Sequence, residues 1–148
     1  IRRERSHVGA LAQMLHAAID ASIAKGALTD AIDYAQNRAR PVLESGVTRA
    51  SDDPYVMSAV GEMRVAASVA EVKVLNAGEA LDRTVVVQTA GGRTDAVTRL
   101  LEKVSIAVAE AEIASTQSSL AVSETMFTVS GASASLSTQN LDRHWRNT

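Results

Sequence analysis

Residues 94–129 read TDAVTRLLEKVSIAVAEAEIASTQSSLAVSETMFTV, and the fold of the chain can be worked out from this stretch. A helical period of 3.6 residues places one set of its side chains on a single face: Leu101, Val104, Val108, Ala111, Ser115, Val122 and Met126. A second set falls roughly opposite: Ile106, Ile113, Leu120 and Phe127. A helix with two apolar stripes must be covered on both sides. We therefore predict a long helix that is either a central core helix or a subunit contact.

The composition favours closely packed helices. The chain has 148 residues, enough for one domain with a single core, and its 46% hydrophobic content comes with only 3% aromatic residues. Proline is scarce, which suits helices and suits a β-sandwich badly. The formal net charge is −2 and no basic block is present, so nucleic acid is not expected as a partner. Cysteine is absent, which excludes disulfides and thiolate metal sites.

The order of the segments predicts an all-α, up-down four-helix bundle. We expect a first helix from about Arg3 to Arg40, ended by Pro41, and a second that begins after Ser51-Asp52-Asp53 at Pro54 and runs to about Arg83. Val85-Val86-Val87 is interpreted as a frayed helix end or connection, and residues 90–93 as a loop. The long helix follows, and then a loop over residues 130–139. Residues 140–148 open a fourth helix that is truncated. No apolar run is long enough to cross a bilayer, and we expect a cytoplasmic protein.

Helical periodicity also assigns faces to the first two helices. The first carries an apolar face made of Val8, Leu11, Leu15, Ala18, Ile19 and Ser22, followed by a drifted one made of Leu28, Ile32, Ala35 and Ala39. The second carries a heptad seam made of Val56, Val60, Met63, Ala67, Ala70, Val74, Ala77 and Leu81. Val65, Val69 and Val72 form a shorter stripe on its far side, so the helices offer more apolar surface than one core needs.

Residue chemistry by itself gives few candidates for a site. The three histidines lie far apart and show no metal-ligand spacing, so no metal site is predicted. The small-residue loop that begins at Gly131 precedes a helix start and could hold an anion on backbone amides, or it could be a simple turn. Arg143, His144 and Arg146 beside Trp145 could bind an anionic or aromatic ligand. Alternatively they form a solvated face, with Leu141 and Trp145 in the core.

Two motifs give a resemblance. Residues 27–38, ALTDAIDYAQNR, resemble the first helix of the C-terminal domain of acyl-CoA dehydrogenases, with its AL-x-x-A-x-x-YA-x-x-R pattern. Residues 131–147 resemble that superfamily's Gly-rich loop and the helix that follows it. Within the superfamily, NLDRHWRN at 140–147 and SDDPY at 51–55 look like the flavin-dependent monooxygenase branch, which includes dibenzothiophene desulfurisation and sulfur-acquisition enzymes.

The resemblance implies that residues 1–148 are the single C-terminal helical-bundle domain of a longer enzyme, and that this domain alone is inactive. It implies a homotetramer, and flavin phosphates bound by Arg38 and by the loop residues Gly131, Ala132 and Ser133. The reaction implied is oxygen transfer to a small organosulfur substrate through a flavin hydroperoxide, with reduced FMN supplied by a separate flavin reductase. No catalytic residue is assigned by this resemblance.

Several positions depart from the dehydrogenase pattern. Ala132 and Ala134 replace glycines of the loop, and the Phe-Gly pair that usually follows the helix-one arginine is missing near Pro41. Thr128 stands where many dehydrogenases have a glutamine that touches the adenosine part of FAD, which is compatible with FMN. Two alternatives stay open. One is an acyl-CoA dehydrogenase domain that uses FAD, and the other is a non-catalytic helical assembly module.

Overall fold

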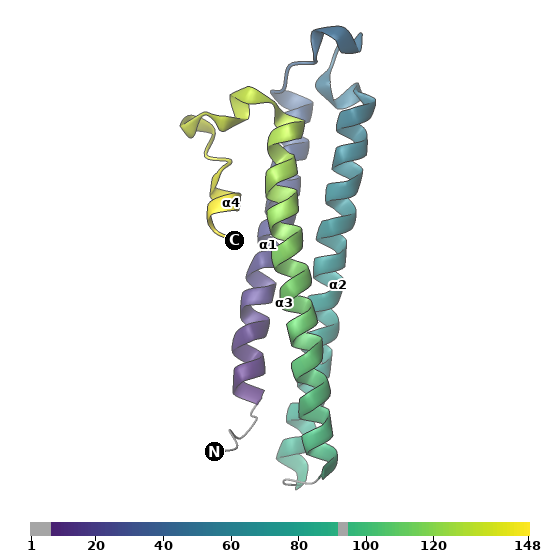
Figure 1. Cartoon of the computed structure of the whole chain (residues 1–148), viewed down its shortest axis with the longest axis vertical. Coiled ribbons are helices and arrows are strands. Elements are labelled where there is room, and N and C mark those ends of the chain that lie inside the picture. The colour runs from purple at the N-terminus through teal and green to yellow at the C-terminus, as the bar shows by residue number, and fades with distance from the viewer. Residues whose placement is uncertain (1–6, 92–94) are drawn as a thin grey trace.

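The computed structural model of the chain describes residues 7–91 and 95–148 (Figure 1). Its helices are α1 His7–Asn37, α2 Pro54–Gly91, α3 Asp95–Ser130 and α4 Arg143–Arg146. Short 3₁₀ turns lie at Leu43–Ser45, Ala50–Asp52, Ala132–Ser135 and Ser137–Gln139. These two ranges contain no β-strand, which confirms the all-α prediction. The predicted helix start at Arg3 and the loop residues Gly92 and Arg93 lie outside the described residues.

The long helices run antiparallel in sequence order, so the bundle goes up along α1, down along α2 and up again along α3 (Figure 1). Each of them packs against the other two. The chain then turns over the upper end of the bundle, and α4 lies beside α1 and α3. The predicted up-down arrangement is confirmed, and the fourth helix is a single turn of residues 143–146.

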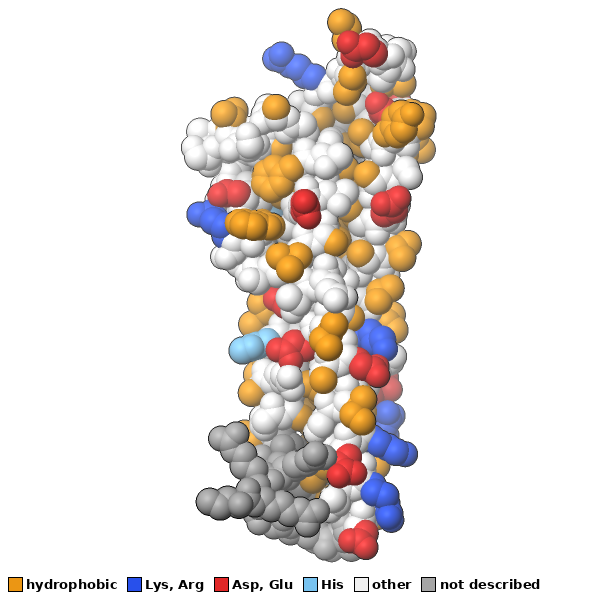
Figure 2. Space-filling view, in the orientation of Figure 1, with side chains coloured by type: hydrophobic (Ala, Val, Ile, Leu, Met, Phe, Trp, Pro, Cys, Tyr) orange, Lys and Arg blue, Asp and Glu red, His pale blue; other side chains and the backbone are white. Residues whose placement is uncertain are grey.

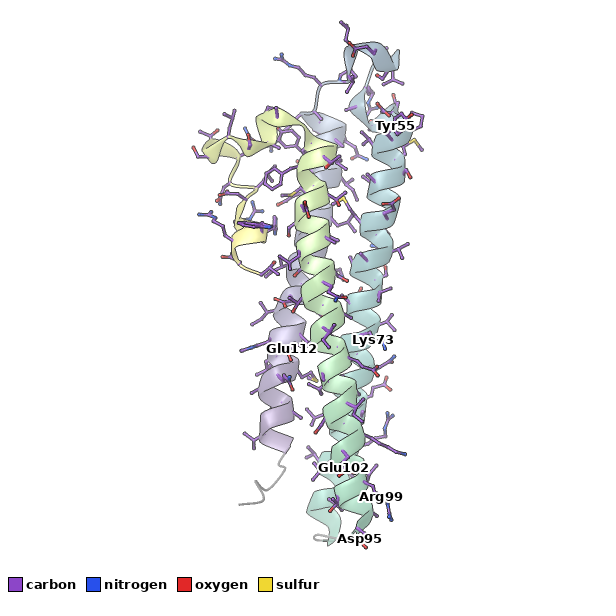
Figure 3. All side chains as sticks on the ribbon, viewed as in Figure 1. Tyr55, Lys73, Asp95, Arg99, Glu102 and Glu112 are labelled. Carbon is purple, nitrogen blue, oxygen red and sulfur yellow. The ribbon has the colours of Figure 1, made fainter. Side chains whose placement is uncertain are left out.

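The start of α2 follows the predicted capping chemistry. Asp53 is buried directly before Pro54, and its Oδ1 accepts a hydrogen bond from the backbone N–H of Tyr55 at 2.8 Å. A carboxylate at this position satisfies an amide that has no partner inside the helix, and Pro54 needs no donor there. Tyr55 itself points outward at the upper end of the bundle (Figure 3).

The predicted end of this helix near Arg83 is wrong, because α2 continues to Gly91. It includes Val85-Val86-Val87 and the first two residues of the predicted loop, Ala90 and Gly91. Valine lowers helix propensity only slightly, so packing decides the outcome. Leu81 and Thr84 are buried against the rest of the bundle, and the Thr84 hydroxyl donates to the Ala80 carbonyl at 2.9 Å. The seam therefore extends the helix beyond its predicted end near Arg83.

The first apolar face predicted for α1 is also wrong as a core face. Its large side chains are exposed: Val8, Leu11, Leu15 and Ile19. The buried side of this half consists of small residues, Ala10, Ala17 and Ala24. Alanine permits a close helix–helix approach, so the helix turns its alanines inward and its larger residues outward. The second predicted face holds, since Leu28 and Ala35 are buried.

Two clusters of buried residues form the core. The upper cluster contains larger side chains, including Leu28, Tyr34, Met63 and Met126, and it reaches Leu141 in the C-terminal segment. The lower cluster is built mainly of alanine and valine, including Ala17, Ala77 and Val108. The heptad seam of α2 supplies buried residues to both clusters, which confirms the prediction of a continuous seam.

Only one of the two apolar stripes of α3 is buried in this chain. The stripe from Leu101 to Met126 faces the core, as predicted, whereas Ile106, Ile113 and Leu120 are exposed. Figure 2 shows hydrophobic side chains interspersed with charged ones along the visible face of the bundle. The buried residues of α3 include serines whose hydroxyls find no hydrogen-bond partner within the described part of the chain: Ser115, Ser123 and Ser130.

Exposed ion pairs connect α2 to its neighbours midway along the bundle. Lys25 of α1 lies 2.9 Å from Glu71, and Lys73 lies 2.9 Å from Glu110 of α3. Lys73 is labelled at mid-height in Figure 3. The Lys25 ammonium lowers the pKa of the Glu71 carboxyl, first through its hydrogen bond and then through its charge. Exposed pairs of this kind contribute little to the free energy of unfolding.

Candidate cofactor-binding loop

A polar stripe on α1 organises the loop that follows α3. Asp30, Tyr34 and Arg38 are spaced four residues apart, so their side chains leave the helix on the same side. The residues that contact this stripe from outside α1 lie at 131–146, about a hundred positions further along the chain. The stripe therefore brings the predicted site residues Arg38 and Ser133 into one region at the upper end of the bundle.

Tyr34 anchors the start of the loop. Its ring is buried in the upper core cluster, and its hydroxyl donates a hydrogen bond to the Oγ of Ser133 at 3.0 Å. The ring holds the hydroxyl in a fixed place because a buried aromatic side chain has little freedom. Ser133 stays exposed, so its hydroxyl can also serve a ligand.

Arg38 lies where α1 ends and faces the other end of the loop. Its Nη1 donates to Oε1 of Gln139 at 3.0 Å, and its Nη2 is 3.9 Å from Oδ2 of Asp33. Its Cζ lies 5.9 Å from the centre of the Tyr34 ring, within the range of a cation–π contact. The side chain is 58% exposed, which leaves guanidinium N–H groups free to reach solvent or an anion.

The loop backbone turns at Gly131, which has φ 73° and ψ −178°. Only glycine adopts this combination easily, so the position is restricted to it. The amide of Gly131 still bonds to the Phe127 carbonyl at 2.9 Å, and the 3₁₀ turn Ala132–Ser135 begins at the next residue. The first amides of such a turn have no acceptor inside it. Ala132 and Ser133 are exposed there, so the turn can present N–H groups to an anion.

The C-terminal segment is tied to α1 through Asp30. Its Oδ2 lies 2.7 Å from Nε2 of His144 and also accepts a bond from Nη2 of Arg143. Arg146 pairs instead with Asp142, with Nε 3.1 Å from Oδ2. The predicted cationic group around Trp145 is therefore engaged within the chain. Leu141 is buried as the alternative reading expected, but Trp145 is 55% exposed and not in the core.

A hollow that is separate from this loop lies near the end of α3. An open cavity of about 360 Å³ is lined mainly by apolar side chains between the 3₁₀ turn at 43–45, the start of α2 and the end of α3. Thr128 lines it, together with Tyr55 and Asp53. Among the described residues no group of three metal-ligating side chains occurs. In the same part of the chain, none of the helices has the length and hydropathy needed to cross a membrane.

Sequence reasoning found Arg38 and the loop but missed Asp30 and Gln139. The available signal was the spacing Asp30, Tyr34, Arg38 on one helix, which indicates a polar stripe in an otherwise alanine-rich segment. Their partners could not be assigned from sequence, because the hydrogen bonds join residues 99 to 114 positions apart.

The sequence profile described as acyl-CoA dehydrogenase, C-terminal domain, matches residues 14–148. The chain belongs to this family. It is 33% identical to a dibenzothiophene monooxygenase of Rhodococcus erythropolis, over 99% of the chain and 34% of that protein. It is 29% identical to a probable FMNH2-dependent monooxygenase, SfnC, of Pseudomonas putida, over 93% of the chain and 33% of that protein.

Solved structures give the same result. FMN-bound TdsC of Paenibacillus sp. A11-2 matches with a TM-score of 0.82 and 25% identity, covering 93% of this chain and 33% of that one. The methanesulfinate monooxygenase MsuC of Pseudomonas fluorescens matches with a TM-score of 0.85 and 29% identity, covering 96% and 36%. This family member thus spans about a third of the length of the monooxygenases it resembles.

Proposed function

We propose that this chain is the C-terminal helical domain of a reduced-flavin-dependent monooxygenase that acts on a small organosulfur compound. The observation that carries the proposal is the convergence of Arg38, Ser133 and the turn at Gly131 at one end of the bundle. It is supported by similarity to proteins named as dibenzothiophene and methanesulfinate monooxygenases. In this proposal the catalytic residues lie mostly outside residues 1–148.

The residues at this end fit the phosphate of a flavin mononucleotide. A phosphate needs donors, and the group offers an exposed guanidinium, a hydroxyl and the leading amides of a 3₁₀ turn. When bound, the reduced flavin would supply the activation of oxygen. Arg38, Gly131, Ala132 and Ser133 would bind and orient the phosphate end, and Tyr34 would hold Ser133 in place.

FMN is preferred to FAD for two reasons. A solved relative is named as FMN-bound, and another relative is named as FMNH2-dependent. In addition, Thr128 occupies the position at which the dehydrogenase pattern has a glutamine, so a contact to adenosine is missing. We further propose that reduced flavin arrives from a separate reductase in the cytoplasm.

Assembly into a homotetramer would cover the exposed apolar side chains of the bundle. Ile106 and Ile113 on α3 and Val65 and Val69 on α2 lie on the surface of this chain. Together they exceed the scattered apolar residues that a monomer usually exposes. Burial against other copies would remove them from water, as the resemblance to the dehydrogenase fold implies.

Substitution of Arg38 tests the cofactor site. In the full-length enzyme, Arg38→Ala should weaken FMN affinity roughly ten- to a hundredfold, because a charge-assisted bond contributes about 1.5–3 kcal/mol. FMN binding can be followed by its fluorescence. Arg40→Ala removes the same charge two residues away and should leave the affinity nearly unchanged. Equal FMN affinity in Arg38→Ala and wild type would refute this role of Arg38.

Activity separates the proposal from its two alternatives. The full-length protein should consume O₂ when it receives reduced FMN and an organosulfur substrate such as dibenzothiophene. It should not oxidise acyl-CoA thioesters with an artificial electron acceptor. Acyl-CoA oxidation would restore the dehydrogenase reading. Absence of flavin binding by the assembled protein would favour a non-catalytic helical module.

A further inference from the structure

The loop at residues 131–139 is a strap fixed at both ends. It leaves α3 after Ser130 and ends at Asn140, whose left-handed backbone (φ 50°) turns the chain toward α4. Between these points it is held by the hydrogen bonds Tyr34–Ser133 and Arg38–Gln139, and Ala134 packs into the upper core cluster. Arg38 and Gln139 meet at the exposed surface, where water competes for both partners.

The far end of the strap is held more firmly. Asp30 accepts hydrogen bonds on a single oxygen from two consecutive residues, Arg143 and His144. His144 is buried, so its contact with the carboxylate is shielded from water. Arg143 also donates through Nη1 to the carbonyl of Asn140 at 2.8 Å, which links the carboxylate to the turn at the end of the strap.

Gly26 completes this attachment. It lies one turn before Asp30 on α1, and a Cβ at this position would stand 3.1 Å from Cε1 and 3.6 Å from Nδ1 of His144. The missing side chain therefore forms the notch in which the imidazole sits. A glycine inside a helix is unfavourable compared with alanine, and the ring explains its presence here.

The geometry points to a positioning function for Gly26 and Asp30. They form a latch that seats His144 and Arg143 and thereby holds the strap, with Ser133, beside Arg38. This inference rests on the proposed function for the identity of the ligand, a flavin phosphate. Its structural part, the control of the strap by the latch, stands on the contacts alone.

Hydrogen exchange in the full-length protein tests the latch. Asp30→Asn keeps the shape of the side chain and removes its charge. We expect amide exchange of residues 131–142 to become roughly tenfold faster, with α2 and α3 unchanged. FMN affinity should fall by about tenfold, because the strap no longer stays beside Arg38. Unchanged exchange in residues 131–142 would overturn the inference.

Asp33→Asn is the matched control. It neutralises a carboxylate on the same helix, but Asp33 lies beside Arg38 and not at the latch. Removal of this negative charge should leave exchange of the strap unaltered and FMN affinity equal or higher. Asp30→Asn should lower FMN affinity and Asp33→Asn should not, and this difference separates positioning from a general effect of charge. A matching fall in affinity in both variants would contradict the latch.

Gly26→Ala provides a second, milder variant that should fold, since alanine is favoured in helices. The new methyl pushes the His144 ring, so exchange of the strap should rise. In a His144→Ala background the same substitution should have no added effect, because the notch is then empty. Gly61→Ala is the control, as a Cβ there meets nothing within 4 Å. Additive effects of Gly26→Ala and His144→Ala would refute the notch.

The two proposals fail in different ways. If Asp30→Asn speeds exchange of the strap but Arg38→Ala leaves FMN affinity unchanged, the latch is correct and the flavin site is wrong. If Arg38→Ala weakens FMN binding while Asp30→Asn leaves the strap unchanged, the flavin site is supported and the latch is wrong.

Discussion

Between Val8 and Ile19, α1 exposes large apolar side chains and buries alanines. Between Gly26 and its end at Asn37, it buries larger side chains and exposes polar ones. Three polar side chains at this end, Asp30, Tyr34 and Arg38, bond to the strap and to α4. The two halves of one helix therefore lie in different environments. Its upper half is covered by residues of the same chain, and its lower half leaves large apolar side chains exposed.

The two core clusters repeat this contrast. The upper one has methionines from α2 and α3 and the ring of Tyr34, and it includes a residue of the C-terminal segment. The lower one has only short side chains besides Leu81 among its buried members. Larger buried side chains remove more apolar area from water. The upper half should therefore contribute more to the free energy of unfolding, and the following substitutions test this difference.

The largest effect is expected for Met126→Ala, since Met126 is fully buried in the upper cluster. A buried methionine replaced by alanine costs about 2–5 kcal/mol. Val108→Ala in the lower cluster removes fewer atoms and should cost about 2 kcal/mol. Denaturant unfolding of both variants measures the difference. A larger loss of unfolding free energy for Val108→Ala than for Met126→Ala would show that the lower half contributes more to stability.

Substitutions in the lower half of α1 should change the free energy of unfolding less, but they should clearly change self-association. The isolated chain should self-associate through its exposed apolar side chains, which sedimentation can detect. Leu11→Lys with Leu15→Lys should reduce association while changing the free energy of unfolding by about 0.5 kcal/mol or less each. Leu43→Lys, at an exposed residue of the upper end, should not reduce association. A monomeric wild-type chain at high concentration would remove this argument.

The smallest effect concerns Glu71, which links α2 to α1 midway along the bundle through its pair with Lys25. Since Lys25 lowers the pKa of Glu71 in the folded state, the pair favours folding above the ordinary value of 4.5. That contribution is lost as the pH falls through the lowered pKa. Lys25→Met should raise the pKa of Glu71 toward 4.5, as measured by NMR titration. Lys73→Met, which breaks the pair with Glu110, should leave it unchanged.

Periodicity predicted the seams of α2 and α3 correctly, because large apolar residues repeat there at the helical spacing and are buried. It failed on the first half of α1, where the conspicuous residues are exposed and alanines form the contact. A pattern identifies apolar faces but not the face that meets a partner. The end of α2 was missed for a related reason, since burial of Thr84 outweighed the weak preference of valine.

For the candidate site, the sequence supplied Arg38 and the loop at Gly131 through resemblance, and the structure supplied their neighbours. The roles of Arg38, Gly131, Ala132 and Ser133 in flavin binding stay predictions. Asp30 could not have been assigned to the C-terminal segment, since its contacts with Arg143 and His144 depend on how α1 and α4 pack. Long-range polar contacts of this kind leave no periodic signal in a sequence.

The orphaned hydroxyls on the buried side of α3 have a consequence for how this protein can change. Ser115, Ser123 and Ser130 each place a polar atom in the interior without a partner in the described part of the chain. An unsatisfied buried hydroxyl costs about 1–3 kcal/mol. Alanine would fit the same space, so single serine-to-alanine substitutions at these positions should raise the stability of the bundle. Under selection for thermal stability, such substitutions could raise the free energy of unfolding without changing the bundle. The added stability would then allow destabilising substitutions elsewhere in the chain.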